Sequence, residues 1–229
     1  MPVYGYVKDS ADKRKLVIDE PAAKVVTQIF ALASQGLQST QIAKILNDEG
    51  VPAPREYKKQ LGLLKRKTNE RINFWNASSV ANIIRDEQYT GKLIFGKKRV
   101  MEIGKNKCMK NPESEWVVAT NAIPVIITEE HFRAVNAIFP KASERKKGIP
   151  TEKLFSRKLK CGHCGMSLIS YSTKKGLKYF CETPTLTDKY NCSADRLYEG
   201  EISEVVLVAL QLHIGIACEA SKFINSEPV

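Results

Sequence analysis

The sequence lacks the marks of a membrane-spanning or secreted protein. No uncharged apolar run reaches the roughly 18 to 20 residues that a membrane span requires. The first residues, Met1 to Tyr6, lack the basic-then-apolar order of a signal peptide. No internal repeat or low-complexity tract is present. We therefore expect a soluble, folded, cytoplasmic protein with no membrane partner.

Acidic residues are fewer than basic residues in this sequence. The 229 residues hold 25 Asp and Glu against 36 Lys and Arg, a formal net charge of +11, and the isoelectric point is near 9.3. Excess positive charge in a compact protein is self-repulsive, so it indicates a polyanionic partner. Nucleic acid is the first candidate and an anionic membrane surface the second, and charge alone does not separate them.

Aromatic residues are also few, at 8% of the chain. The sequence lacks the aromatic-rich sheet signature with which RNA-binding domains stack single strands. RNA is therefore a weaker candidate than double-stranded DNA.

Two segments together carry the whole excess of positive charge. Residues 55–71 have a net charge of +5 and residues 141–160 a net charge of +6. Both are poor in periodic apolar residues, and Gly148 and Pro150 interrupt the second, so we interpret both as exposed loop and linker. They are either solvated linkers or arms that lie along phosphates, where released counterions make binding depend steeply on salt.

The first third of the chain predicts two short helices. Pro21 occupies a first helical position, apolar residues recur at helical spacing as far as Ala33, and Gly36 ends the segment. A second helix leads through Leu46 and ends at Gly50. Two short helices joined by a glycine-containing turn have the outline of a helix-turn-helix. Proteins that never contact DNA also contain such pairs, so the outline leaves the function open.

A third helix is predicted after Trp75, with Asn76 to Ser79 as its capping sequence. Val80 faces inward, while Asn82 and Arg85 face outward. Asn, Ser and Arg side chains in the first half of a helix can reach base edges or phosphates. The segment is either a helix that enters a DNA groove or an ordinary amphipathic helix. In either case we interpret Trp75 as a core anchor.

Strands are predicted within residues 89–101 and 116–119, and Thr128 caps a further helix that carries Phe132 and Val135. Residues 1–140 are thus predicted to form one mixed helical and strand domain. Residues 141–158 are predicted to form a basic linker. Residues 159–229 are predicted to form a second, small domain.

Four of the six cysteines have the spacing of metal ligands. Cys161 and Cys164 form a CxxC knuckle, and Cys181 and Cys192 follow after 16 and 10 intervening residues. A knuckle supplies half of a tetrahedral Zn²⁺ shell, and the hairpin predicted over 167–180 can bring the other half. We expect one structural zinc ion with no open coordination position, which iron could replace in an overexpressed sample.

A redox-active CxxC is the competing interpretation of the knuckle. That motif favours a helix N-terminus after a strand, and it gains nothing from two additional cysteines. Cys108 and Cys218 have no evident partner, and we expect both to be unliganded. The 159–229 segment is therefore predicted to be a zinc β-ribbon followed by a helix over 197–216 that packs on the ribbon. The predicted fold class is α+β.

The order of these elements resembles the C-terminal, DNA-binding part of the large serine recombinases. The resemblance covers nearly the whole chain. It rests on Tyr4-Gly5-Tyr6, Gly36 with Ile42-Ala43, Leu46-Asn47 and Gly50-Val51-Pro52, Trp75 with Ser79-Val80 and Ile83-Ile84, Tyr89 and Gly91, Ile123 to Ile127 with Phe132, Phe155-Ser156, Cys161 to Gly165, Tyr179-Phe180-Cys181 and Cys192.

The resemblance implies a recombinase domain with a helix-turn-helix-like pair, a recombinase zinc β-ribbon and a C-terminal helix. It implies sequence-specific binding of double-stranded DNA at an attachment half-site, in phage integration or transposon movement. The family's nucleophilic serine and arginine cluster precede the element that Tyr4-Gly5-Tyr6 resembles. We therefore expect no catalytic residue in this chain, no small-molecule substrate, and other recombinase protomers as protein partners.

The predicted DNA-contacting residues are those in the third helix, the two basic segments and the ribbon hairpin. They are Asn76, Ser78, Ser79, Asn82, Arg85, Lys65, Arg66, Lys67, Lys141, Arg145, Lys146, Lys147, Lys174, Lys175 and Lys178, with Ser170 and Ser172 as weaker candidates. The alternative hypothesis is a zinc-ribbon module that binds proteins and has only non-specific affinity for nucleic acid. Steep salt dependence together with a preferred sequence would favour the DNA hypothesis.

Overall fold

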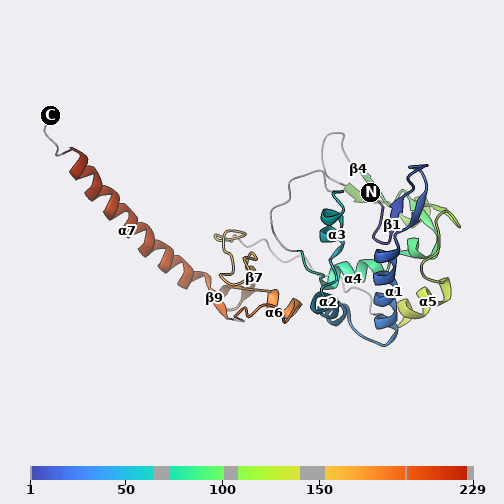
Figure 1. Cartoon of the computed structure of the whole chain (residues 1–229). Coiled ribbons are helices and arrows are strands. Elements are labelled where there is room, and N and C mark those ends of the chain that lie inside the picture. Colours follow the sequence, from blue (N-terminus) through green and yellow to red (C-terminus); the bar gives the residue numbers. More distant parts are fainter. Residues whose placement is uncertain (1, 64–72, 101–107, 140–152, 194, 226–229) are drawn as a thin grey trace. The chain divides into compact units, whose positions relative to one another are not determined.

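The computed structural model describes residues 2–63, 73–100, 108–139, 153–193 and 195–225. These residues form two compact units, the first within 2–139 and the second within 153–225 (Figure 1). Each unit mixes helices and strands, as the predicted α+β class requires.

The first unit contains short strands and a group of α-helices. Its elements in chain order are β1 (Tyr6–Lys8), β2 (Leu16–Ile18), α1 (Glu20–Ser34), α2 (Ser39–Asp48), α3 (Pro54–Gln60), α4 (Ala77–Ile84), the 3₁₀ helix η1 (Glu87–Thr90), β3 (Leu93–Phe95), β4 (Lys98–Val100), β5 (Cys108–Lys110), the 3₁₀ helix η2 (Glu113–Glu115), β6 (Val117–Ala119) and α5 (Glu129–Ile138). The strands form three two-stranded antiparallel sheets, β1 with β2, β3 with β6, and β4 with β5. Strand β5 lies between the two ranges in which strands were predicted, 89–101 and 116–119, so the sequence analysis missed it.

The core of the first unit lies between its helices. The apolar stripe of α1 is buried, with Val26, Ile29 and Phe30 fully enclosed, and Ile42 and Leu46 of α2 are equally buried. α1 contacts α2, α4 and α5, and α2 contacts α4. The periodicity that predicted the first two helices is therefore confirmed, and α4 joins their core.

The start of the chain is tied to this core by buried tyrosines. The Tyr89 hydroxyl donates to the Tyr4 carbonyl oxygen at 2.9 Å, and the Tyr6 hydroxyl donates to the Pro124 carbonyl oxygen at 2.8 Å. Gly5 has a φ of +97°, and a Cβ there would lie 3.1 Å from the Ile126 side chain. The Tyr4-Gly5-Tyr6 sequence therefore fits this place because glycine alone adopts that backbone conformation without strain.

The first basic segment is not wholly a loop, contrary to the sequence interpretation. Residues Pro54–Gln60 form helix α3. Tyr57 anchors it, since its ring meets the Tyr4 ring edge-on with centroids 5.7 Å apart and its hydroxyl donates to the Asp19 carboxylate at 2.9 Å. One aromatic residue and a proline at the first helical position are enough to dock a two-turn helix that has no apolar periodicity.

Helix α4 is joined to α2 by a buried amide. The Asn47 side-chain amide donates to the Trp75 carbonyl oxygen at 3.0 Å, and its oxygen accepts from the Trp75 backbone N–H at 2.8 Å. The Trp75 indole N–H donates to the Val51 carbonyl oxygen at 3.1 Å, and the ring is fully buried. Trp75 is thus a core anchor, as predicted, and Asn47 fixes where α4 begins.

The second unit is a small sheet with a long helix. Its elements are β7 (Ile169–Thr173), β8 (Gly176–Phe180), α6 (Thr183–Leu186), β9 (Arg196–Tyr198) and α7 (Glu199–Asn225), and the strands form an antiparallel sheet in the order β7-β8-β9. Phe155, Leu177 and Tyr179 are its buried apolar core. Phe155 belongs to the segment predicted as linker, so the packing of this unit begins before residue 159.

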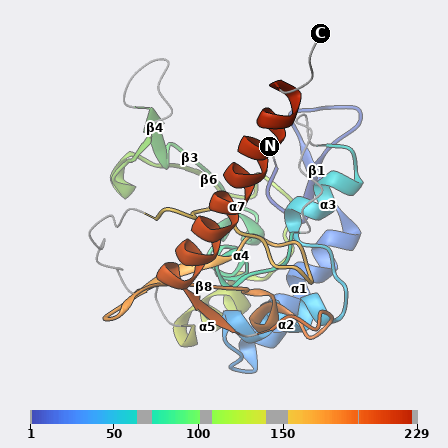
Figure 2. The same cartoon turned by 90° about the vertical axis from the view of Figure 1, so that its left-hand side faces the viewer.

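The prediction that the C-terminal helix packs along the ribbon is wrong for most of its length. Ile202 packs against the ribbon core, whereas Val205, Leu212 and Ile216 are 71%, 63% and 64% exposed. The 27 residues of α7 rise about 40 Å, while a five-residue strand spans only about 17 Å. The sheet is too short to cover the helix (Figure 2).

One stretch of α7 has the length and mean hydropathy of a membrane-spanning helix, although it contains charged residues. By length and composition, Glu199–Ser221 is apolar enough to cross a membrane, with a mean hydropathy of 1.6 and none of it buried. Its uncharged stretch is shorter than a membrane span requires, because Glu204 and Glu219 stand at the two ends of that stretch.

We predict that Asn47→Ala destabilises the first unit by about 2 to 4 kcal/mol, because it leaves the buried N–H and C=O of Trp75 without partners. Denaturant unfolding followed by tryptophan fluorescence measures this, since both tryptophans, Trp75 and Trp116, lie in the first unit. Asn82→Ala, at an exposed position of α4, is the control and should change the free energy of unfolding by no more than about 0.5 kcal/mol. Equal stability of the two variants would contradict the anchoring role of Asn47.

Candidate nucleic-acid interface and metal centre

Helix α4 presents a polar face whose first residues form its cap. The Asn76 side chain accepts from the Ser79 backbone N–H at 2.9 Å, and the Ser79 hydroxyl accepts from the Asn76 backbone N–H at 3.1 Å. Ser78, Asn82 and Arg85 are exposed, and their spacing of four and three residues places them on one side of the helix. Of the five residues predicted to contact DNA here, Asn76 and Ser79 form the N-terminal cap, and Ser78, Asn82 and Arg85 form an exposed row. Arg85 is the C-cap residue, so it lies at the end of the helix and not in its first half as expected.

The opposite side of α4 is buried. Val80 and Ile84 are fully enclosed, and Ile83 is 6% exposed. Because this apolar side packs on α1, α2 and α5, the exposed row is held on a rigid element rather than on a loop.

Seven predicted DNA-contacting residues lie outside the described residues. They are Lys65, Arg66 and Lys67 of the first basic segment and Lys141, Arg145, Lys146 and Lys147 of the second. Their roles stay predictions.

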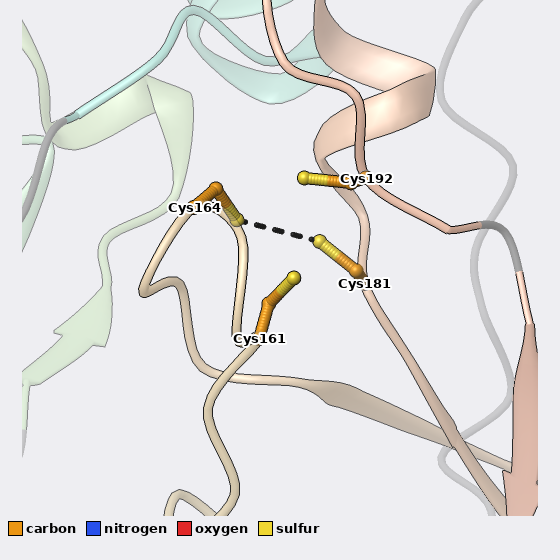
Figure 3. A group of neighbouring side chains, drawn as sticks. All are labelled: Cys161, Cys164, Cys181 and Cys192. Atoms are coloured by element: carbon orange, nitrogen blue, oxygen red, sulfur yellow. Dashed lines mark hydrogen bonds between the residues drawn. The ribbon is translucent and has the colours of Figure 1, made fainter.

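The four predicted metal ligands lie together at one end of the ribbon. Their sulfur atoms all lie within 4.8 Å of one another, and Figure 3 shows the four side chains pointing at a common centre. Cys161 and Cys164 come from the knuckle, Cys181 directly follows β8, and Cys192 comes from the loop before β9. Residues that are up to 31 positions apart are thus brought to one point.

Backbone hydrogen bonds shape the knuckle. The Cys161 N–H donates to the Met166 carbonyl oxygen at 2.8 Å, and the Gly165 N–H donates to the Cys161 carbonyl oxygen at 2.9 Å. Gly165 has a φ of +69°, which turns the chain back towards β7. The turn brings the Cys164 sulfur within 3.6 Å of the Cys181 sulfur (Figure 3).

The environment makes the four thiols unequal. The backbone N–H groups of Cys164 and His163 point at the Cys161 sulfur and lower the pKa of that thiol to about 6. Desolvation, together with hydrogen bonds to the neighbouring thiols, raises the pKa of Cys192 to about 12, and burial raises the pKa of Cys181. Four thiolates this close would repel one another, so a bound cation is the group that stabilises all four in the deprotonated form.

The arrangement fits one tetrahedral metal ion. A Zn–S bond of about 2.3 Å places sulfur atoms about 3.8 Å apart around the ion, and the Cys164 and Cys181 sulfurs are already at 3.6 Å. Four sulfur ligands complete the shell and leave no position for a substrate. His163, Cys108 and Cys218 are exposed and lie outside the cluster.

The ribbon lysines occupy two different places. Lys174 and Lys175 form the exposed turn between β7 and β8, while Lys178 lies within β8 with its ammonium group 4.1 Å from the centre of the Tyr198 ring. Ser170 and Ser172 pair with Tyr179 and Leu177 and so lie on the side of the sheet that carries the core.

Sequence reasoning missed Arg196 of β9. Its guanidinium carbon lies 5.7 Å from the Tyr171 ring centre and 5.9 Å from the Phe180 ring centre. A three-residue strand between a loop and a helix shows too little alternation to be predicted, so no signal in the sequence placed this cation beside those rings.

Both units match known protein-family models. Residues 20–142 match the family described as Recombinase, and residues 154–211 match the Recombinase zinc beta ribbon domain. The chain belongs to the recombinase family. The first match alone covers more than half of this recombinase chain, and the second contains all four clustered cysteines. The resemblance stated from the sequence motifs is confirmed.

Solved structures similar to this recombinase chain include one described as the crystal structure of an LSR–DNA complex and one from work on the sequence requirements of the Listeria innocua prophage attP site. Each is 16% identical to it with a TM-score of 0.33. The chain is covered to 90% and 92% by these matches, which span 57% and 78% of the respective solved chains. The recombinase chain thus corresponds to just over half of the first solved chain. Among curated proteins, no relative matches it at a significant level.

We predict that the purified chain carries one zinc ion and that Cys181→Ser removes it, because three thiolates and a hydroxyl bind zinc far more weakly than four thiolates. Elemental analysis of the zinc-to-protein ratio measures this, and circular dichroism reports the accompanying loss of strand structure. Cys108→Ser removes an exposed cysteine and should retain one zinc ion per chain. Equal zinc content in the two variants would contradict the assigned ligand set.

Proposed function

We propose that this chain reads an attachment half-site in double-stranded DNA, as the DNA-recognition part of a large serine recombinase. The exposed row of Ser78, Asn82 and Arg85 on α4 is the observation that carries the proposal. Amide and guanidinium groups on a rigid helix suit hydrogen bonding to base edges in the major groove, and the hydroxyl suits bases or phosphates. The family membership of both units supports the same role.

The metal ion in this proposal is a structural zinc. Cys161, Cys164, Cys181 and Cys192 hold it, and it supplies folding free energy to the ribbon. We assign DNA recognition, and no bond-breaking step, to the residues of this chain. In the complete recombinase its protein partners are other protomers, and the cytoplasm is where it meets DNA.

The basic segments complete the proposed interface. With +5 over residues 55–71 and +6 over residues 141–160, they add phosphate contacts to those of the groove-reading elements. Contacts by two units joined by a basic linker produce a long half-site, with more sequence information than one helix can read.

A protein-interaction module is the second candidate. The exposed apolar side chains along α7, among them Val205, Leu210 and Ile214, favour it. Such a module would bind DNA only weakly and without sequence preference, so one experiment separates the two functions.

We predict that the full chain with zinc enriches one long sequence from a random duplex library, that chelation abolishes enrichment, and that affinity falls steeply between low and physiological salt. Salt-sensitive binding without any enriched sequence would favour a basic phosphate binder, and no binding at low salt would favour the protein module. The selected duplex is then the probe for variants.

We predict that Asn82→Ala combined with Arg85→Ala lowers affinity for the selected duplex at least tenfold and leaves binding to random duplex within about threefold, since base contacts are worth about 1 to 3 kcal/mol each. Changing Arg145, Lys146 and Lys147 together to alanine should weaken both kinds of binding and reduce the slope of log affinity against log salt by up to about 3. Lys24→Ala, an exposed cation of α1, is the control for loss of charge alone. An unchanged preference for the selected sequence in the α4 variant would contradict the groove-reading role.

A further inference from the structure

The three-stranded sheet of the second unit has one covered side and one uncovered side. Directly paired residues of antiparallel strands lie on the same side of a sheet. Leu177 and Tyr179 lie on the covered side, where they pack against Phe155 and the first turn of α7 at Ile202.

The uncovered side carries three aromatic rings and two cations, together with Ile169 and Thr173 of β7. Tyr171 pairs with Lys178, which pairs with Tyr198, and one step along the sheet Phe180 pairs with Arg196. We call these five residues the ribbon face. The rings and Lys178 are half-buried, and Arg196 is exposed.

Each cation of the ribbon face lies over the rings of its neighbours. The Lys178 ammonium group lies 4.1 Å from the Tyr198 ring centre. The Arg196 guanidinium group lies within 6 Å of the rings of both Tyr171 and Phe180, which meet edge-on at 84°. Contacts at these distances are attractive and hold long, flexible side chains in one orientation.

Neither cation has an acidic partner within the described part of the chain. Among the described residues, no side chain forms an ion pair or hydrogen bond with the side chain of Lys178 or Arg196. Two positive charges on one side of a sheet are complementary to an anion, and a guanidinium group beside aromatic rings can still use its N–H groups for bidentate contacts.

We propose that the ribbon face is a DNA-contacting surface of this recombinase and that Arg196, with Lys178, binds phosphates or guanine edges of a duplex. The proposal rests on the proposed function, because it requires that the chain bind duplex DNA. Lys178 is already among the predicted DNA contacts, so the proposal adds Arg196, which the sequence motifs did not single out, and the sheet face that the two cations share.

Duplex DNA is the occupant that this chemistry fits, rather than a single strand. Proteins that bind single strands stack bases on open aromatic faces. Here each of the rings of Tyr171, Phe180 and Tyr198 has one of the chain's own cations within 6 Å of its centre, so positive charge stands beside every ring and competes with a stacked base. Strands of a β-ribbon can enter the major groove, where arginine pairs with guanine O6 and N7.

The metal centre fixes the strands that carry these cations. Phe180 directly precedes the ligand Cys181, and Arg196 follows the ligand Cys192 by four residues. At its other end β9 leads into α7, where the Tyr198 N–H donates to the Glu201 carboxylate at 2.8 Å. β9 is therefore pinned at both ends, which holds Arg196 in register with Phe180.

The test compares single variants of the zinc-loaded full chain binding to the selected duplex and to a random-sequence duplex pool. Arg196→Gln should weaken binding to the selected duplex about tenfold and reduce the salt slope by about 1, and Lys178→Gln should weaken it about threefold to tenfold. Lys189→Gln removes an exposed cation of the same unit that lies outside the sheet, and it should leave affinity within about twofold of the unmodified chain.

Wild-type affinity and salt slope in both the Arg196 and Lys178 variants would overturn the ribbon-face proposal while leaving the proposed function intact. Failure of the unmodified chain to bind any duplex would overturn both. Arg196→Gln also removes contacts that hold β9, so a second measurement uses the unmodified chain. The Arg196 Nε–Hε resonance should shift on NMR titration with duplex, and an unmoved resonance at saturation would overturn the proposal.

Discussion

The four sulfur atoms beside β8 are the constraint on which the second unit depends. Its buried apolar core consists of Phe155, Leu177 and Tyr179, and burial of such side chains contributes only about 1.5 to 3 kcal/mol each. Ordering the backbone costs about 1 to 2 kcal/mol for every residue, so this core cannot fix the ribbon alone. The proposed metal ion would supply the missing folding free energy. Two of its four ligands lie directly after β8 and in the loop before β9.

The first unit is stabilised by the packing of its apolar side chains. Its helices enclose a continuous core, and the buried amide of Asn47 joins the end of α2 to the residue before α4. In both units a buried anchor holds an uncovered polar surface, the α4 row in one and the ribbon face in the other. A half-site reader needs this combination, because contacts that discriminate between bases require side chains held in fixed positions.

Prediction from sequence succeeded where a pattern was long or chemically distinctive and failed where it was short. The periodic apolar residues of α1 and α2 predicted buried helices, and Asn76 to Ser79 predicted the cap of α4. Helix α3 and strand β5 were missed because they carry no periodic signal and are held by a few contacts, such as Tyr57 on Tyr4. The predicted packing of α7 was wrong because apolar spacing indicates a face and says nothing of how much surface is available to cover it.

By itself the sequence determined the family, through the order of its motifs, and it predicted that Cys161, Cys164, Cys181 and Cys192 lie together, through their spacing in a segment with little apolar content. Only the tertiary structure decided which cations stand on a common surface. Arg196 lies 25 residues from Tyr171 and 16 from Phe180, and the register of β7, β8 and β9 alone brings them together. Register depends on hydrogen bonding between strands and on the closure of the chain at the four sulfurs, and neither is local to the residues concerned.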